Sequence, residues 1–168
     1  ADTPIELPAV TVERLGYTFI GWSERQDTTP ADTRDIIYVG ENYLPTGNEQ
    51  EKTLYAVWSP RTDMTYTVEH YVEQINNIGQ YDLRLTETFN DGKVGDLAYA
   101  IAKEGGDFEG FTENSSHSDR VGMAEVKGDG STVLKLYYIR DKFDLVVKGE
   151  NATTVGTRVE VPYETEVT

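Results

Sequence analysis

The sequence predicts a strand-rich α+β fold with two modules, one complete and one split between the N- and C-terminal ends of the chain. Three observations lead to this prediction: period-two alternation of apolar residues, two short segments with helix boundary signals, and a glycine–aromatic pattern that occurs twice. A sheet crossed by one short helix is a two-layer arrangement that buries one face of each element.

The strands are indicated by alternation and by residue type. Residues 66–72 alternate in the manner of a sheet with one buried face, and residues 83–89 and 133–139 do the same. Tyr, Val, Thr and Ile fill these segments, as expected for a pleated surface. The sequence Asn90-Asp91-Gly92 is suited to positive φ and predicts a turn after the second strand.

Two segments are predicted to be helical. Asp96 is placed to cap a helix over residues 97–104, which Gly105 and Gly106 would end. The second predicted helix lies between Pro8 and Leu15 and would end before a glycine. Both precede the glycine–aromatic pattern, so we expect the order strand, strand, short helix, strands in each module.

The glycine–aromatic pattern divides the chain into modules. It occurs at residues 16–22 with a strand-like segment at 53–58, and more loosely at residues 106–111 with 133–139 downstream. The strand and turn that open the second copy reappear near the C-terminus, where residues 143–148 begin a new unit. We therefore predict a complete module at residues 61–141, the later part of a split module at 1–60, and its first hairpin at 142–168.

These residues carry a family resemblance. The segment Leu15-Gly16-Tyr17-Thr18-Phe19-Ile20-Gly21-Trp22, with Leu54-Tyr55-Ala56-Val57-Trp58, resembles the internalin B-repeat family, also called the Listeria-Bacteroides repeat. Residues 66–139 resemble mucin-binding-protein-like repeats of Gram-positive bacterial surface proteins. The segment between Trp22 and Leu54 is longer than the corresponding segment of the family pattern.

The resemblance implies β-grasp-like modules strung along the stalk of a large, cell-wall-anchored bacterial surface protein. It also implies an extracellular location, no catalytic activity and no cofactor. The implied function is a non-enzymatic structural repeat of a stalk or adhesin. The alternative is an adhesion module that recognises host glycan or mucin.

Composition excludes several classes of partner. With 30 acidic and 15 basic residues the net charge is −15, which disfavours nucleic acid because phosphate binding requires a basic surface. The chain has no cysteine, so neither disulfides nor thiolate metal sites contribute. No segment has the roughly 20 apolar residues of a membrane span, and no signal peptide opens the chain. We therefore expect any export signal or anchor to lie outside this segment.

Candidate catalytic and metal residues are few. Ser116, His117 and Asp119 resemble a hydrolase triad in type only, because triad members normally come from separate elements. The other histidine, His70, lies within a predicted strand. Asn90, Asp91 and Asp96 could offer oxygen ligands to calcium, but they do not have the spacing of acidic residues that a calcium-binding loop requires. We predict no catalytic residue and no metal site.

The aromatic residues permit two interpretations. Trp22, Trp58 and the 11 tyrosines are either hydrophobic core, which we favour, or a platform on which sugars stack. A Lys–Asn isopeptide crosslink, known from bacterial surface stalks, would require a buried lysine, and the sequence leaves open whether Lys135 or Lys148 is one.

The terminal partial modules predict self-association. Each would leave an apolar face and strand edges uncovered. If residues 142–168 of one copy complete residues 1–60 of the next, strand complementation produces a head-to-tail homo-oligomer or filament. Closure within one chain is the alternative. The predicted interface consists of Phe143, Leu145, Val147, Val159 and Val161 on the hairpin, and Tyr17, Phe19, Trp22, Leu54, Val57 and Trp58 on the acceptor.

Overall fold

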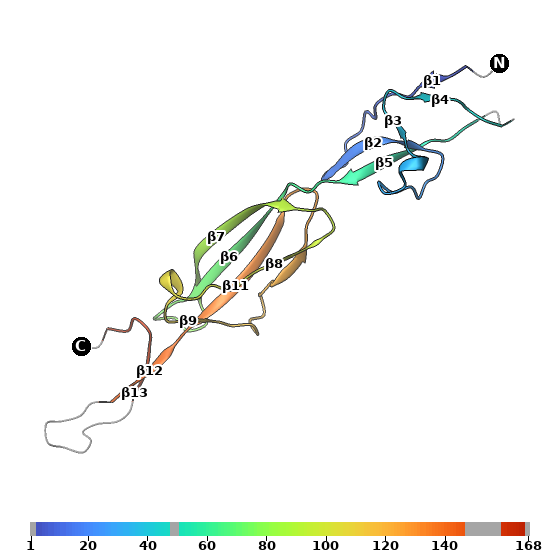
Figure 1. Ribbon diagram of the computed structural model, residues 1–168. Coiled ribbons are helices and arrows are strands. Elements are labelled where there is room, and N and C mark those ends of the chain that lie inside the picture. The colour runs from blue at the N-terminus through green and yellow to red at the C-terminus, as the bar shows by residue number, and fades with distance from the viewer. Residues whose placement is uncertain (1–2, 48–50, 147–158, 167–168) are drawn as a thin grey trace, which may run out of the picture. The chain divides into compact units, whose positions relative to one another are not determined.

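The described part of the chain is almost entirely β-structure. A computed structural model describes residues 3–47, 51–146 and 159–166 (Figure 1). Its helical elements are two 3₁₀ helices, η1 (Thr33–Asp35) and η2 (Gly106–Phe108). No α-helix occurs within these ranges. The prediction of an α+β fold with β-grasp-like modules is therefore wrong.

The predicted helix at residues 97–104 is replaced by a strand, β8 (Leu97–Tyr99), which pairs with β10 (Met123–Glu125). Ala98 is buried while its neighbours Leu97 and Tyr99 are exposed. The alternation has the period of a strand, with the small residue on the inner side. Asp96 therefore caps no helix. Its carbonyl instead accepts a hydrogen bond from the Val126 N–H at 2.9 Å, next to the pair of strands β8 and β10.

The second predicted helix, between Pro8 and Leu15, is an irregular segment. The exposed side chains of Val12 and Leu15 leave it without a buried apolar stripe, and tertiary packing of such a stripe supplies most of the stability of a short helix. The segment ends in a turn in which the Tyr17 N–H donates to the Arg14 carbonyl at 3.0 Å.

The chain divides into two compact units. The first comprises residues 1–65, 90–96 and 125–131, and the second comprises residues 66–89, 97–124 and 132–168.

The first unit is built on two small sheets. One sheet has the strand order β3 (Ile37–Tyr38), β2 (Tyr17–Ser23), β5 (Tyr55–Pro60), and the other pairs β1 (Ile5–Glu6) with β4 (Asn42–Tyr43). β2 and β5 are antiparallel, with Tyr17 opposite Pro60 and a bulge after Phe19. The buried apolar residues include Leu7, Ile36, Tyr43 and Val57. In the long segment after Trp22, Arg25 pairs with Asp35 at 2.8 Å.

The second unit contains a four-stranded sheet in the order β7 (Tyr81–Gly92), β6 (Met64–Glu73), β11 (Thr132–Arg140), β9 (Phe111–Glu113). β6 and β11 are parallel, and β9 and β11 are antiparallel. The predicted strands at 66–72, 83–89 and 133–139 lie inside β6, β7 and β11 and are confirmed.

The predicted turn at Asn90-Asp91-Gly92 is wrong, because these residues belong to strand β7. Asn90 is held there by a hydrogen bond from the Thr65 hydroxyl at 2.9 Å. The chain turns instead at residues 93–96, where Gly95 adopts φ +88° and the Asp96 N–H donates to the Lys93 carbonyl.

The core of the second unit is formed by Val72, Phe108, Phe111, Leu136 and Tyr138. Phe108 comes from η2, and its ring centroid lies 4.8 Å from that of Tyr138. A single 3₁₀ turn therefore supplies an aromatic side chain to this core.

A polar network runs through this core. The fully buried His70 lies with Nδ1 2.9 Å from the Tyr138 hydroxyl and Nε2 2.9 Å from a Glu87 carboxylate oxygen. The Lys103 N–H donates to the same hydroxyl at 2.9 Å, and Lys103 Nζ donates to Glu87 at 2.6 Å. A hydroxyl that accepts from Lys103 can donate its proton to Nδ1, which leaves Nε2–H to donate to Glu87.

The network also sets the electrostatics of its members. Burial would raise the pKa of the Glu87 carboxyl, but hydrogen bonds from Lys103 and His70 outweigh burial and hold that pKa below its ordinary value. Burial raises the pKa of the Tyr138 hydroxyl. Among the described residues, no buried side-chain nitrogen or oxygen lacks a hydrogen-bond partner, so this core tolerates its polar groups.

Replacing Tyr138 with Phe tests the network. The variant leaves the Lys103 N–H and His70 Nδ1 without their shared partner, and we expect the free energy of unfolding to fall by about 1–3 kcal/mol. Urea denaturation followed by far-ultraviolet circular dichroism measures this change. The matched control is Tyr99→Phe at an exposed position, which should have little effect. Equal effects of the two variants would contradict a structural role for the network.

Candidate assembly interface

The acceptor side of the predicted interface is strand β5 and the aromatic residues around it. Phe19 lies edge-to-face against Trp22 and Trp58, with ring centroids 5.2 and 5.5 Å apart. The Trp22 indole N–H donates to the Pro8 carbonyl at 2.8 Å. The three rings are half-buried and pack against one another. These contacts are those of a packed hydrophobic cluster.

A hollow of about 480 Å³ lies beside this cluster. Its walls are formed by the segment before β2, by Tyr17 and Phe19 of β2, and by Trp58 of β5. The Arg14 guanidinium covers the Tyr17 ring at 3.8 Å. Val12 and Leu15, which also line the hollow, are 63% and 70% exposed. The first unit thus has a recess with a mixed lining, in which Glu13, Arg14 and Arg61 accompany the apolar residues.

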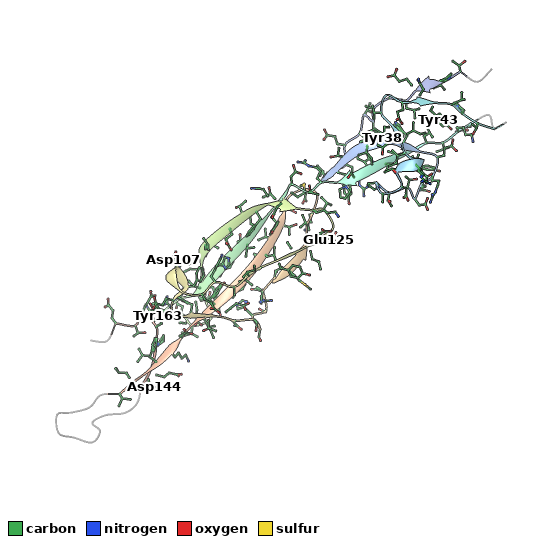
Figure 2. The ribbon with its side chains drawn as sticks, viewed as in Figure 1. Tyr38, Tyr43, Asp107, Glu125, Asp144 and Tyr163 are labelled. Atoms are coloured by element: carbon green, nitrogen blue, oxygen red, sulfur yellow. The ribbon has the colours of Figure 1, made fainter. Side chains whose placement is uncertain are left out.

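The donor side is a C-terminal hairpin, in which β12 (Lys142–Leu145) pairs antiparallel with β13 (Val159–Pro162). Phe143 and Leu145 are 53% and 36% exposed, although both are large apolar residues. Together with Val161 they line a small hollow of about 180 Å³. Figure 2 shows the side chains of this region, with Asp144 and Tyr163 labelled.

The base of this hairpin is held by Arg140, the last residue of β11, whose side chain is buried. Its Nε donates to the Glu73 carbonyl at 2.9 Å. One terminal nitrogen donates to the Tyr163 carbonyl at 3.1 Å and to the Glu164 carboxylate at 2.6 Å. An arginine can serve several acceptors at once because its donors are fixed in a plane. Arg140 therefore ties the end of β6 to the residues that follow β13.

The backbone around this base repeats the backbone around the start of β6. In the second unit, the Asp141 N–H donates to the Gly110 carbonyl at 2.9 Å, and the Tyr163 N–H donates to the Asp141 carbonyl at 2.8 Å. In the first unit, the Arg61 N–H donates to the Gly16 carbonyl at 2.8 Å, and the Val94 N–H donates to the Arg61 carbonyl at 3.0 Å. We call this arrangement the junction.

The two junction glycines adopt the same conformation. Gly16 has φ +77° and Gly110 has φ +75°. A Cβ atom on Gly16 would collide with Val94 and Gly128, and a Cβ atom on Gly110 would overlap the Tyr163 ring. Both positions thus require glycine for conformation and for space. A residue that crowds each glycine, Val94 or Tyr163, lies one or two positions after the returning strand of a hairpin.

The remaining predicted interface residues are partly described. Val57 is buried, Leu54 and Val161 are half-buried, and Tyr17 lies under Arg14. Val147 lies outside the described residues, as does the side chain of Val159. Sequence reasoning did not find Gly110, Arg140 or Tyr163 as anchors of the hairpin, because their contacts link distant segments.

A second aromatic cluster, which the sequence analysis missed, contains Tyr71, Tyr81, His117 and Tyr137. Tyr137 is stacked between Tyr71, at 5.0 Å, and His117, at 3.8 Å. Tyr81 meets both His117 and Tyr137 edge-on. A hydrogen bond to Glu69 raises the pKa of Tyr71 to about 12. Tyr71, Tyr81 and His117 remain half-exposed.

The residues considered for chemistry have other contacts. His117 Nδ1 accepts the Asp119 backbone N–H at 3.2 Å, and the Ser116 N–H donates to Asn114. No group of three or more possible metal ligands occurs in the described ranges. Lys135 is 39% exposed and lies 3.9 Å from Glu69; Lys148 is outside the described residues.

Comparison with known proteins gives no relative: no family model, curated protein or solved structure matches this chain. Neither 3₁₀ helix in the described part is long or apolar enough to cross a membrane.

Substituting alanine at Gly110 tests the junction. Alanine at Gly110 must adopt positive φ and also displace Tyr163, whereas alanine at Gly105, with φ +65° and open space, meets only the conformational cost. We expect both variants to lose about 1 kcal/mol from strain, and Gly110→Ala to lose at least about 1 kcal/mol more. Gly110→Ala should also speed tryptic cleavage after Lys142. Equal stability and equal cleavage rates in the two variants would contradict the proposed anchoring of the hairpin.

Proposed function

We propose that this chain is a non-enzymatic structural segment of a repeat-built bacterial cell-surface stalk or adhesin. The observation that carries the proposal is the junction, which occurs once in each unit with the same backbone hydrogen bonds. Proteins built from repeated modules use the same contacts at each step, because each module is stabilised mainly by its neighbours in sequence.

In this proposal the junction restrains the start of each hairpin within its own unit. In each copy, one residue that follows a long strand, Arg61 or Asp141, bonds to a glycine carbonyl on one side and to the end of the next hairpin on the other. The start of the following hairpin is thereby held by three segments of backbone. A spacer requires this restraint, since a flexible linker would permit collapse.

Charge and sequence resemblance support a surface location. The net charge of −15 gives a well-solvated, self-repelling surface, which suits a protein displayed in many copies. The resemblance of residues 15–22 to repeats of bacterial surface proteins is the reason for placing it outside the cell. In this proposal the parent protein is anchored to the cell wall and the segment provides spacing and display.

The second candidate function is recognition of host glycan or mucin. The observation in its favour is the half-exposed cluster of Tyr71, Tyr81 and His117, which lies beside the polar groups of Glu69 and Lys135. Aromatic faces beside hydrogen-bonding groups suit sugar rings. Against it, both faces of Tyr137 are already occupied by neighbouring rings.

Tandem fusions of one, two and three copies, with Thr168 joined to Ala1, test the structural function. We expect the maximum dimension in small-angle X-ray scattering to rise by the same increment with each added copy, because each junction restrains its hairpin. A flexible chain of modules would instead show diminishing increments. Diminishing increments would reject the stalk function.

A glycan array tests the second function. Specific binding that is lost in Tyr81→Ala but retained in Tyr99→Ala, an exposed tyrosine outside the cluster, would favour glycan recognition. If the wild-type chain binds no glycan on the array, or if both variants bind equally, the cluster has only a packing role.

A further inference from the structure

We propose that the hollow beside β5 is a docking groove for a β-hairpin, and that its occupant is the hairpin framed by β12 and β13 of a second copy of this chain. The inference rests on the proposed function in one respect, the equivalence of the modules. It adds the surface, the partner and the strand orientation.

The junction aligns the two units residue by residue. Gly110 corresponds to Gly16, and Asp141 corresponds to Arg61. The strand pairs that follow agree, because Phe111 opposite Arg140 matches Tyr17 opposite Pro60. Counting along the chain from these positions gives the further correspondences Asp107 with Glu13, Phe108 with Arg14, and Tyr138 with Trp58.

In the second unit, the hairpin of β6 and β7 covers the residues at these positions. His70 of β6 packs against Phe108 and Tyr138, at centroid distances of 5.6 and 5.9 Å. Arg84 of β7 donates to the Asp107 carbonyl at 2.7 Å and lies over the Phe111 ring. The hairpin thus contacts all four residues: Asp107, Phe108, Phe111 and Tyr138.

In the first unit, the four counterparts line the hollow: Glu13, Arg14, Tyr17 and Trp58. The hollow is therefore located at the surface that a hairpin covers in the second unit. β6 lies parallel to β11, the counterpart of β5. The same arrangement would place an incoming strand parallel to β5, along the edge that β2 does not occupy.

The composition of β5 supports a covered edge. Natural edge strands usually carry charged residues that discourage pairing with other strands. The outermost strand of the second unit, β7, follows this rule with Asp82, Arg84, Glu87 and Asp91. β5 has the sequence Tyr-Ala-Val-Trp-Ser-Pro, without a charge. Its sequence resembles that of β11, an interior strand, more than that of a protected edge.

The chain itself carries a hairpin of the required kind. β12 begins just after Asp141, as β6 begins shortly after Arg61. In the described ranges β13 is the only strand that pairs with β12, just as β7 would be the only strand paired with β6 if β11 were absent. The exposed side chains of Phe143 and Leu145 supply apolar surface for a partner.

The proposed contact is head-to-tail, because the groove of one copy binds the hairpin of the next. The groove and the hairpin are different surfaces, so one copy can use its groove and its hairpin at the same time. Assembly in solution should therefore continue beyond a dimer as concentration rises. The chain has two tryptophans, Trp22 and Trp58, and both belong to the cluster beside the groove. Their emission therefore reports on the occupation of the groove.

The test uses the full chain and three variants. The groove variant is Val12→Asp with Leu15→Asp, the hairpin variant is Phe143→Asp with Leu145→Asp, and the control is Ile101→Asp at an apolar residue that is 77% exposed elsewhere. All substituted side chains are at least 36% exposed, so folding should survive. Circular dichroism checks folding, and Leu15→Asp alone and Leu145→Asp alone are the milder variants to use if a double variant unfolds.

Sedimentation velocity and tryptophan emission are measured over a hundredfold range of concentration. We expect the wild type and the control to assemble, with a blue shift of emission, and each double variant alone to remain monomeric. A mixture of the two double variants should form a dimer and stop there, because it contains one intact groove and one intact hairpin per pair.

Four outcomes would overturn the inference: a wild type that stays monomeric, assembly without an emission change, a mixture that does not dimerise, or a control that loses assembly. The stalk function is judged separately by the scattering of tandem fusions. Monomeric wild type together with constant increments would reject this interface and leave the stalk function in place.

Discussion

The arrangement of the chain depends on close backbone approach at two glycines. At Gly16 and Gly110 the backbone turns with positive φ, and neighbouring atoms occupy the space where a side chain would begin. This allows each glycine carbonyl to accept a hydrogen bond from the residue that follows the last strand of the pair, Arg61 after β5 or Asp141 after β11.

Polar side chains reinforce the backbone contacts in the second unit. Arg140 joins three acceptors at the base of the C-terminal hairpin, and His70 joins β6 to β7 and β11 through Glu87 and Tyr138. Both residues are buried with their hydrogen bonds satisfied. Satisfied polar groups add geometric restraint to a core, because each bond must be broken before strands can slip. A small module gains a defined strand register in this way.

The sequence was sufficient to predict the long strands of the second unit but not the elements that cover them. Alternation located β6, β7 and β11, although the apolar side chains of Leu83 and Leu85 in β7 are exposed. The segment Leu97-Ala98-Tyr99 was misassigned because Asp96 and the glycines at 105 and 106 resemble helix boundary signals, whereas here Ala98 is the small inward residue of a strand. The aromatic recurrence led to the prediction of an acceptor face around Trp58, but the hollow depends on which segments meet in space. The glycines stood out in the sequence only as part of the glycine–aromatic pattern, and their partners Val94 and Tyr163 could not be recognised without the structure.

When two modules are joined covalently, the interface between them needs less affinity than an interface between separate copies. In an array, a hairpin is joined to the module it completes by a short stretch of chain, and the effective concentration of such a tethered partner reaches about the millimolar range. Between separate copies, the same groove and hairpin meet only at their bulk concentration and bear the full entropic cost of association. A contact of modest affinity between copies is therefore enough to be nearly saturated within an array. The exposed rim of Val12 and Leu15 fits this regime, because it offers apolar area to a tethered hairpin while the acidic surface opposes indiscriminate association.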